Sequence, residues 1–449
     1  MSTLPHPLRH ENVSTRTHAI RLGLLLLLGS VPLAAGYPAF FPGKWFERTL
    51  SPAPAPLRVA KKKVPASPQA ATPWPEAQRL RHIDPDADRN GDGSASAPWN
   101  DLETALRALR PGDRLQLRPG RYRTRIRIDK SCRSGTKEAP IQVVGGPGVR
   151  IEAPPSPGSG LIVLTRSYWY LRHLEVAVGG VATPALRLVG SDAHHLWIDS
   201  CHLHGGGSSG ISMGVGSHHL RITRCTIHDF IHPTPPIDAH GISIRAGTSD
   251  ILIENCHIYR NSGDSIQVTG PEQCGRRPAH LRPAPARRIT IAGNRMHDDR
   301  ENAIDIKTSS DIRIEGNVMW GYRPSRTSNG VAVTVHYGSQ RISITDNHIA
   351  RSHTGIAVHR GQIDQHPHPL QPSDIVVSDN VIEGATDSLP WAIRLGEILP
   401  PLRVTDNRVT GHSQAVQTAK SLLQQLASNS ELTLRNNRLL PNRAALDNR

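Results

Sequence analysis

The sequence predicts an all-β protein that folds as a right-handed parallel β-helix, a solenoid of roughly ten coils, and three observations lead to this prediction. Short strands with alternating apolar and polar residues recur after residue 110. An Asn or Cys recurs at one position of these repeats, at intervals of 23 to 38 residues. Aromatic residues make up only 4% of the 449 residues, whereas glycine and proline number 38 and 37, a turn-rich composition that does not suit one thick core.

The first part of the chain lies outside this pattern. Three arginines precede an apolar run over residues 22–35, which is typical of a cleaved signal peptide or, alternatively, of an inner-membrane anchor. Residues 1–36 are therefore predicted to be this targeting segment, and the folded part to be secreted or periplasmic. Residues 37–78 are rich in Pro, Ala and Lys and predict a linker, which leaves residues 79–449 as the β-helix domain.

The charge balance indicates an anionic partner. The chain has 53 Lys and Arg against 38 Asp and Glu, a formal net charge of +15. Nucleic acid is not expected, because aromatic residues that would stack on bases are few and the predicted location is not cytoplasmic. We expect an acidic polysaccharide as the partner, a monomer, and contact with a membrane only through an uncleaved anchor.

An amphipathic segment over residues 99–113 precedes the repeats. Its apolar residues recur at helical spacing, at Leu102, Ala105, Leu106 and Leu109. Because a solenoid must cover its first open coil, we expect a helix near residues 100–109 to cap the N-terminal end.

Nine segments of the type LWIDSCHL or IRIEGNVM share one residue position at a turn. This position is occupied by Cys201, Cys225, Cys256, Asn294, Asn317, Asn347, Asn380, Asn407 and Asn437. An inward Asn amide can form hydrogen bonds with the turn backbone and with the same residue of neighbouring coils. The pattern predicts an internal ladder, in which the three cysteines are buried, reduced thiols.

Three stretches around the predicted helix carry a resemblance to a known family. They are NGDGSASAPW from Asn90, GDRLQLRPGRY from Gly112 and SGTKEAPIQV from Ser134. Together they resemble the opening of secreted bacterial β-helix polysaccharide lyases. The resemblance implies the fold and a polysaccharide substrate.

Ionisable side chains gather on the outer face predicted for the second strand of each coil, when these strands are aligned by their first inward apolar residue. They are His240, Arg245, Asp264, Gln267, Asp305 and Lys307, and Arg323, His336 and His359 extend the row. In this alignment Thr334 lies beside Lys307. An insertion over residues 270–288 interrupts the repeat and is basic.

These residue types suit β-elimination on a uronate polymer. The reaction needs neutralisation of the uronate carboxylate, a base at C5 and a proton for the leaving oxygen. Lys307 can be the base if burial or nearby cations lower its pKa, and His240 and Arg245 are further catalytic candidates. The residues expected to bind substrate are Gln267, Arg276, Arg277, Arg323, His336 and His359.

The chain also resembles family-nine pectate lyases and the chondroitinase-B type of alginate and dermatan lyases. This resemblance implies a strand lysine as the base and calcium bound by carboxylates. The carboxylates expected to hold calcium are Asp264, Asp298, Asp299 and Asp305. The function predicted first is therefore a calcium-assisted polysaccharide lyase.

Two other functions stay open. The turn Asp238-Ala239-His240-Gly241 partly matches the Asp-Pro-His-Asp turn of mannuronan-type C5-epimerases of this fold. A non-catalytic carbohydrate-binding or exopolysaccharide-export protein is the other alternative. An inverting hydrolase of the polygalacturonase type is disfavoured, because the Gly-His-Gly and Arg-Ile-Lys motifs of that family do not occur here.

Overall fold

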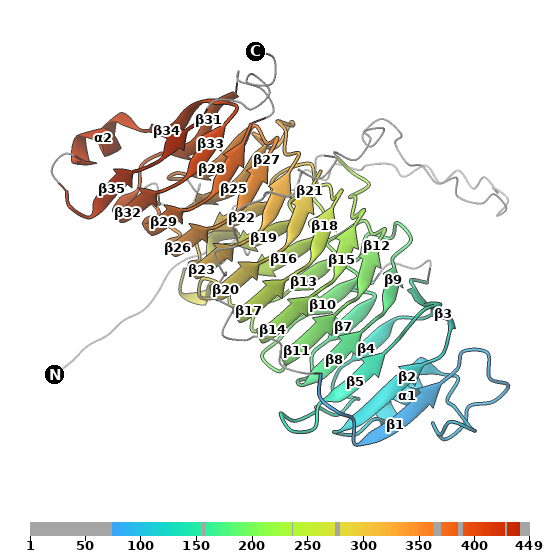
Figure 1. Cartoon of the computed structure of the whole chain (residues 1–449). Helices are drawn as coiled ribbons and strands as arrows, with labels where there is room; N and C mark the ends of the chain where they lie inside the picture. Colours follow the sequence, from blue (N-terminus) through green and yellow to red (C-terminus); the bar gives the residue numbers. More distant parts are fainter. Residues whose placement is uncertain are drawn as a thin grey trace, which may run out of the picture. The chain divides into compact units, whose positions relative to one another are not determined.

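The computed structural model describes residues 74–154, 158–235, 237–273, 279–361, 370–384, 389–426 and 429–440. These residues form a right-handed parallel β-helix, as predicted, in which successive coils contribute strands to three parallel sheets and only the coils at the two ends lack a strand in one or two of them (Figure 1). The sheets, here called A, B and C, have 13, 12 and 11 strands in the described residues, slightly more coils than expected.

Within each sheet the strands lie side by side in chain order. Sheet A contains β1 (Arg79–Ile83), β2 (Asp113–Leu117), β5 (Ile141–Val144), β8 (Trp169–Arg172), β11 (His194–Asp199), β14 (His218–Thr223), β17 (Ser249–Glu254), β20 (Arg287–Ala292), β23 (Ser310–Glu315), β26 (Gln340–Thr345), β29 (Ser373–Ser378), β32 (Leu399–Thr405) and β35 (Leu432–Arg435). Sheet B contains β3 (Gly120–Arg123), β6 (Val149–Glu152), β9 (Glu175–Ala177), β12 (His202–His204), β15 (Thr226–His228), β18 (His257–Tyr259), β21 (Arg295–His297), β24 (Val318–Trp320), β27 (His348–Ala350), β30 (Val381–Glu383), β33 (Arg408–Thr410) and β36 (Arg438–Leu439). Sheet C contains β4 (Ile126–Ile128), β7 (Ile162–Leu164), β10 (Leu186–Leu188), β13 (Ile211–Met213), β16 (Ile242–Arg245), β19 (Ile266–Thr269), β22 (Ile304–Lys307), β25 (Val331–His336), β28 (Thr354–Val358), β31 (Leu389–Leu395) and β34 (His412–Thr418).

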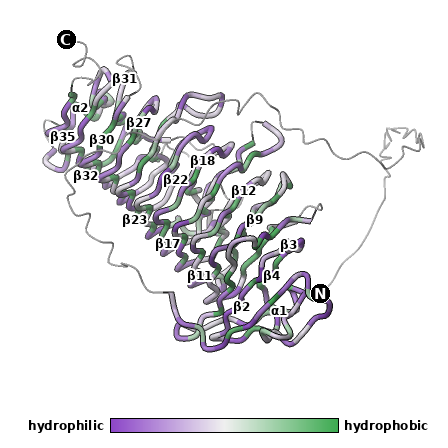
Figure 2. Tube along the Cα trace, turned by 45° about the vertical axis from the view of Figure 1, so that its right-hand side comes forward, coloured by the Kyte–Doolittle hydropathy of each residue, from purple (hydrophilic) through white to green (hydrophobic). Residues whose placement is uncertain are grey.

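The core runs along the inside of the three sheets. Alternate residues of each strand point inward, and identical positions of successive coils stack, as Ile198, Ile222 and Ile253 do in sheet A. Figure 2 shows this alternation as hydrophobic and hydrophilic residues that succeed one another along each coil. Burial of each such isoleucine contributes about 1.5–3 kcal/mol, so the stacked columns stabilise the solenoid coil by coil.

The predicted ladder lies at the turn between sheets A and B. Asn294 Nδ2 donates hydrogen bonds to Asn317 Oδ1 at 3.0 Å and to the Ile253 carbonyl at 3.0 Å, and the same pattern continues to Asn437. Cys201, Cys225 and Cys256 extend the ladder as buried free thiols. The Cys225 Sγ, for example, lies 3.6 Å from the Ile198 carbonyl of the preceding coil.

A left-handed residue makes each of these turns tight. The residues directly before the ladder positions all have positive φ: Ser200, Arg224, Asn255, Gly293, Gly316, Asp346, Asp379, Asp406 and Asn436. Asn, Asp and Gly tolerate this conformation better than other residues, which explains why they dominate the position.

The predicted cap is helix α1 (Leu102–Ala108). Asp101 begins it, because its side chain accepts a hydrogen bond from the Thr104 N–H at 2.7 Å. Leu102, Ala105 and Leu106 are buried at the end of the solenoid that carries β1 and β2 (Figure 1).

The other helices are short. They are α2 (Lys420–Leu426) and the 3₁₀ turns η1 (Pro271–Gln273) and η2 (Ala279–Leu281). Within the described residues no helix has the length and apolar character needed to cross a bilayer. The predicted targeting segment, residues 1–36, and most of the predicted linker lie outside the described part of the chain.

Candidate functional site

The predicted row of ionisable residues lies on the outer face of sheet C, with one correction of register. Gln267 of β19 pairs with Asp305 of β22, as expected, but Lys307 pairs with His336 rather than with Thr334. Thr334 is instead the partner of Asp305. The sequence alignment placed Val331 beside Ile304, whereas Val333 is the residue that pairs with Ile304, because β25 begins two residues earlier than the alignment assumed. A shift of two residues keeps the same face of the strand outward, so the hydrophobic pattern did not reveal the error.

Asp305 is the centre of the site. Its Oδ2 lies 2.8 Å from Lys307 Nζ, and its Oδ1 accepts a hydrogen bond from His336 Nε2 at 2.8 Å. Although it points away from the core, Asp305 is only 4% exposed. Burial alone would raise the pKa of this carboxyl, but His336 and Lys307 outweigh burial and lower it.

Lys307 is therefore held as a cation. Burial tends to lower the pKa of the ammonium, but the neighbouring carboxylates of Asp305 and Asp264 raise it above its ordinary value. Lys307 was expected to act as the base only if burial or nearby cations lowered its pKa, and this condition is not met because the dominant neighbours are anions. In this state Lys307 can neutralise a substrate carboxylate but cannot accept a proton.

His359 supplies the basic nitrogen that Lys307 lacks. It follows β28, and its ring centroid lies 5.2 Å from that of His336. His359 Nδ1 donates a hydrogen bond to the Arg360 carbonyl at 2.8 Å, so that Nε2 of the neutral ring carries the lone pair. Burial, with a smaller contribution from His336, lowers the pKa of His359, which keeps this ring neutral at physiological pH.

A second buried carboxylate, Asp264, organises the neighbouring coil. Its Oδ1 accepts from the Asn302 backbone N–H at 3.0 Å and from Asn302 Nδ2 at 2.8 Å, and its Oδ2 accepts from Gln267 Nε2 at 3.0 Å. His240 Nδ1 lies 3.3 Å from the same Oδ2. Burial opposes protonation of His240, but Asp264 and the nearby Asp238 raise its pKa overall.

The four predicted calcium ligands are not brought together. Asp299 points into the solenoid, where it accepts hydrogen bonds from Asn261 N and Nδ2, each at 2.8 Å, and from Tyr322 Oη at 3.2 Å. Burial raises the pKa of Asp299 to about 7. Asp298 follows β21 of sheet B and binds His297 Nδ1 at 2.8 Å.

These contacts decide whether the set fits calcium. Calcium needs six to eight oxygen ligands around one point. Asp264 and Asp305 lie on sheet C and are engaged by protein donors, whereas Asp298 and Asp299 diverge from each other. The residues present therefore do not fit the predicted calcium site.

The remaining predicted residues are dispersed around this centre. Arg245 is exposed on β16, in the same outward column as Thr269, and Arg323 is exposed in the turn before β25. Arg276 and Arg277 lie outside the described residues.

Two residues beside the predicted set were assigned no role from the sequence. Asn302 bridges Asp264 and the Ser328 hydroxyl, which donates to Asn302 Oδ1 at 3.0 Å. Glu301 is 7% exposed, and burial together with the Asp264 charge raises its pKa to about 7. The sequence signal was their position just before β22, but a turn residue is normally exposed, so the pattern gave no reason to expect burial.

A groove of about 810 Å³ lies elsewhere, on sheet A, between residues such as Tyr170, Trp197 and Thr290. One of its aromatic side chains, Trp197, is already covered: the Arg221 guanidinium lies 4.3 Å from its ring centroid, and the Trp74 ring centroid lies 4.8 Å from it. The buried and hydrogen-bonded ionisable side chains gather on sheet C instead, and for this reason the candidate site is placed there.

Comparison with known proteins supports the fold. Residues 81–272 match the family model of the Pel9A-like, right handed beta helix region, and residues 281–439 match that of the right handed beta helix region. No significant sequence match exists among curated proteins.

Three solved structures of similar fold are all distant in sequence. The alginate lyase from Paenibacillus sp. str. FPU-7 is 17% identical, with a TM-score of 0.50 over 76% of this chain and 98% of that chain. The A-module of the mannuronan C-5 epimerase AlgE4 from Azotobacter vinelandii is 15% identical, with a TM-score of 0.51 over 79% and 100%. The surface adhesin PfbA of Streptococcus pneumoniae is 13% identical, with a TM-score of 0.55 over 75% and 88%. The chain is thus a right-handed parallel β-helix repeat protein.

Proposed function

We propose that this protein cleaves an acidic, uronate-containing polysaccharide by β-elimination at the outer face of sheet C, outside the cytoplasm and as a monomer. The observation that carries the proposal is the group around Asp305: a buried carboxylate that holds the Lys307 ammonium beside His336 and the neutral ring of His359. The net charge of +15 favours a polyanion. An alginate lyase and a mannuronan C-5 epimerase have this fold, so the fold is compatible with action on a uronate polymer.

Each residue has a role that its environment supports. The Lys307 ammonium neutralises the uronate carboxylate, which makes the adjacent C5–H more acidic. Asp305 holds Lys307 in place and, through His336 Nε2, orients the His336 ring beside His359. Arg245, further along the same face, binds a carboxylate of a neighbouring sugar.

The proton then moves to His359. Its Nε2 accepts the C5 proton, the C4–C5 double bond forms as the C4–O bond breaks, and the leaving oxygen takes a proton from the imidazolium just formed. No step passes through calcium, since the carboxylates present do not form a calcium site.

The test uses pectate, alginate and glycosaminoglycans, each with the metal chelator EDTA and with added calcium. Release of the unsaturated uronate is followed by its ultraviolet absorbance. We expect one polymer to be degraded at a similar rate in both conditions. A His359→Asn variant, which keeps a polar, hydrogen-bonding side chain but has no basic nitrogen, should lose about 10²–10⁴-fold in rate. Activity that disappears in EDTA, or that survives in His359→Asn, would contradict the proposed mechanism.

A C5-epimerase is the second candidate, and the cluster around His240 favours it. His240 is 8% exposed, lies against Asp264 and follows Asp238, whose carboxylate pairs with Arg300. An epimerase breaks the same C5–H bond but returns a proton to the opposite face of C5, and the C4–O glycosidic bond stays intact. Deuterium uptake at C5 from D₂O without unsaturated product would assign this reaction. Polymer binding without unsaturated product and without deuterium uptake would indicate a non-catalytic carbohydrate-binding or export protein.

A further inference from the structure

A row of stacked rings runs along the outer face of sheet B, which is a different face from the candidate active site. Its members are His204, His228, Tyr259, His297 and Trp320, from five successive coils. Neighbouring rings are nearly parallel, with interplanar angles of 8°, 11°, 2° and 13°. Because each ring covers the face of the next, the row offers ring edges and nitrogen atoms rather than a flat surface for sugars.

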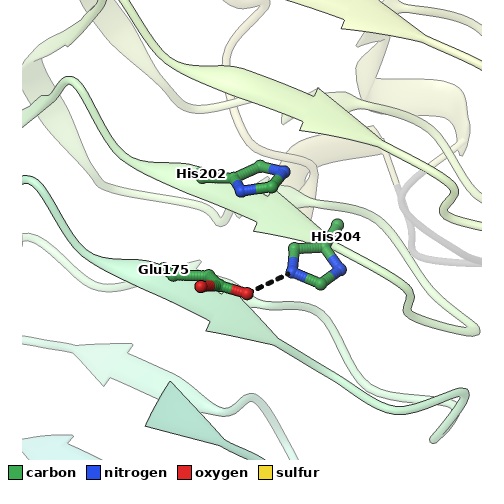
Figure 3. Close-up of side chains that lie close together, drawn as sticks. All are labelled: Glu175, His202 and His204. Atoms are coloured by element: carbon green, nitrogen blue, oxygen red, sulfur yellow. Dashed lines mark hydrogen bonds and ion pairs between the residues drawn. The ribbon is translucent and has the colours of Figure 1, made fainter. Parts of the chain in front are cut away.

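At the N-terminal end of this row three potential metal ligands converge. Glu175 of β9 lies beside His202 and His204 of β12, and each offers a ligand atom within 4.8 Å of the other two (Figure 3). His204 Nε2 is 3.1 Å from Glu175 Oε1. All three are half-buried, so an ion can reach them from solvent. The His202 and His204 side chains share a face because they are two residues apart on one strand.

The neighbouring coil sets the tautomer of His202. His228 Nδ1 donates to Asp229 Oδ2 at 2.7 Å, so that Nε2 of the neutral His228 ring is an acceptor. His202 Nε2 lies 2.7 Å from this atom and therefore carries the donated proton. The lone pair of His202 is then on Nδ1, and no donor among the described residues is hydrogen-bonded to this atom.

We propose that Glu175, His202 and His204 bind a divalent transition-metal ion, Zn²⁺ in the first instance, with His202 coordinating through Nδ1. His228 and Asp229 are positioning residues that orient His202, in the arrangement by which histidine ligands are commonly held. Arg260 in turn donates to Asp229 Oδ1 at 2.8 Å, and Arg150 donates to Glu175 Oε1 at 2.6 Å.

The ligand chemistry selects the class of metal. Two imidazoles and one carboxylate suit Zn²⁺, Cu²⁺ or Ni²⁺, whereas Ca²⁺ and Mg²⁺ require oxygen ligands. The 3.1 Å between His204 Nε2 and Glu175 Oε1 is close to the separation of about 3.3 Å that two ligands at about 2.0 Å from a tetrahedral Zn²⁺ would have.

The site links two coils. Glu175 comes from one coil and both histidines from the next, so that a bound ion ties β9 to β12 and stabilises the native state by mass action. Because the ligands lie on sheet B and the candidate active-site residues on sheet C, we expect metal to raise stability without being required for turnover.

Isothermal titration of the full, untagged chain with ZnCl₂ tests the site. We expect one Zn²⁺ equivalent that Glu175→Gln and His204→Gln each abolish. His228→Ala should weaken the same equivalent by about 10–100-fold, because it removes the positioning partner but no ligand. Titration with CaCl₂ should show no binding at this site.

The matched control is His257→Ala. His257 Nε2 contacts His297 Nε2 at 2.8 Å, and His297 Nδ1 contacts Asp298, so this pair repeats the His202–His228 relay without a facing glutamate. Its removal should leave the Zn²⁺ equivalent intact. Circular dichroism of each variant verifies folding, and Glu175→Gln keeps the side-chain shape. No Zn²⁺ binding by the wild type, or equal binding by all the folded variants, would overturn the proposal.

Discussion

The ammonium of Lys307 and the carboxylate of Asp305 lie 2.8 Å apart on one strand, with side chains only 19% and 6% exposed. The two residues are separated by one inward isoleucine, so they necessarily share the outer face of β22. Lys307 is consequently a half-buried cation whose nearest anion is Asp305. This relationship determines both the chemistry proposed for the site and its effect on stability.

Replacement of Asp305 should expose this dependence. Asp305→Asn removes the nearest anion of the Lys307 ammonium, and breaking a largely buried pair in this way costs about 3–5 kcal/mol in the free energy of unfolding. Urea denaturation measures the change. The control is Asp311→Asn, which breaks the exposed pair with Arg341 and should cost about 1 kcal/mol or less. Equal losses of unfolding free energy in the two variants would show that burial does not make the Asp305–Lys307 pair more important for stability than an exposed pair.

The ladder should be sensitive at single positions. Asn347 Nδ2 donates to Ile314 O at 2.9 Å and to Asn380 Oδ1 at 3.0 Å, and its Oδ1 accepts from Asn317. Asn347→Ala removes these bonds and leaves buried partners unsatisfied, at about 1–3 kcal/mol for each such group. Thermal and urea unfolding should show a clear loss, whereas the exposed Gln340→Ala should change stability by about 0.5 kcal/mol or less.

Asp299 should make stability depend on pH. Its folded pKa of about 7 exceeds the ordinary value of 3.8, so the folded state holds a proton that the unfolded state has lost. The stabilisation is fully present below pH 3.8 and is lost as pH rises to about 7. Asn does not ionise, so the free energy of unfolding of Asp299→Asn should lack this dependence on pH. Relative to the wild type, it should rise by up to about 4 kcal/mol between pH 4 and pH 8. A difference that does not vary with pH would exclude a raised pKa.

The ladder thiols should resist modification. Cys201, Cys225 and Cys256 are buried free thiols, and burial raises the pKa of Cys201 and Cys225 well above the ordinary value. Mass spectrometry after alkylation of the native protein should find all three unlabelled, with labelling only in denaturant. Ready labelling of all three under native conditions would contradict the inward ladder.

The stacked coils could be predicted from the sequence because the same interactions recur in each coil. An inward Asn or Cys at one turn position can satisfy its hydrogen bonds only if the coils stack, so nine occurrences of the pattern imply parallel stacking. The amphipathic segment before it could only be a cap, and α1 has the buried face expected of one.

The geometry of the candidate site was harder to predict from the sequence. Val331 and Val333 are both apolar, so a shift of two residues in β25 preserves the pattern and left the Lys307–His336 neighbourhood hidden. Asp298 and Asp299 are adjacent in the sequence, but only Asp299 joins the internal network. The direction of the pKa shift of Lys307 depends on the charge of the side chains around it. Those neighbours are known only once the register of the sheet C strands is known.

The rate of unsaturated uronate release by Lys307→Ala is the most direct measurement of the proposed chemistry. It is compared with the wild type on the polymer that the wild type degrades, with the exposed Arg438→Ala as a remote control. Loss of the charge that neutralises the substrate carboxylate should reduce turnover by about 10²–10³-fold, while Arg438→Ala keeps the wild-type rate. Near-wild-type turnover in a folded Lys307→Ala variant, or a wild type that releases no unsaturated product from any uronate polymer, would contradict a lyase site on sheet C.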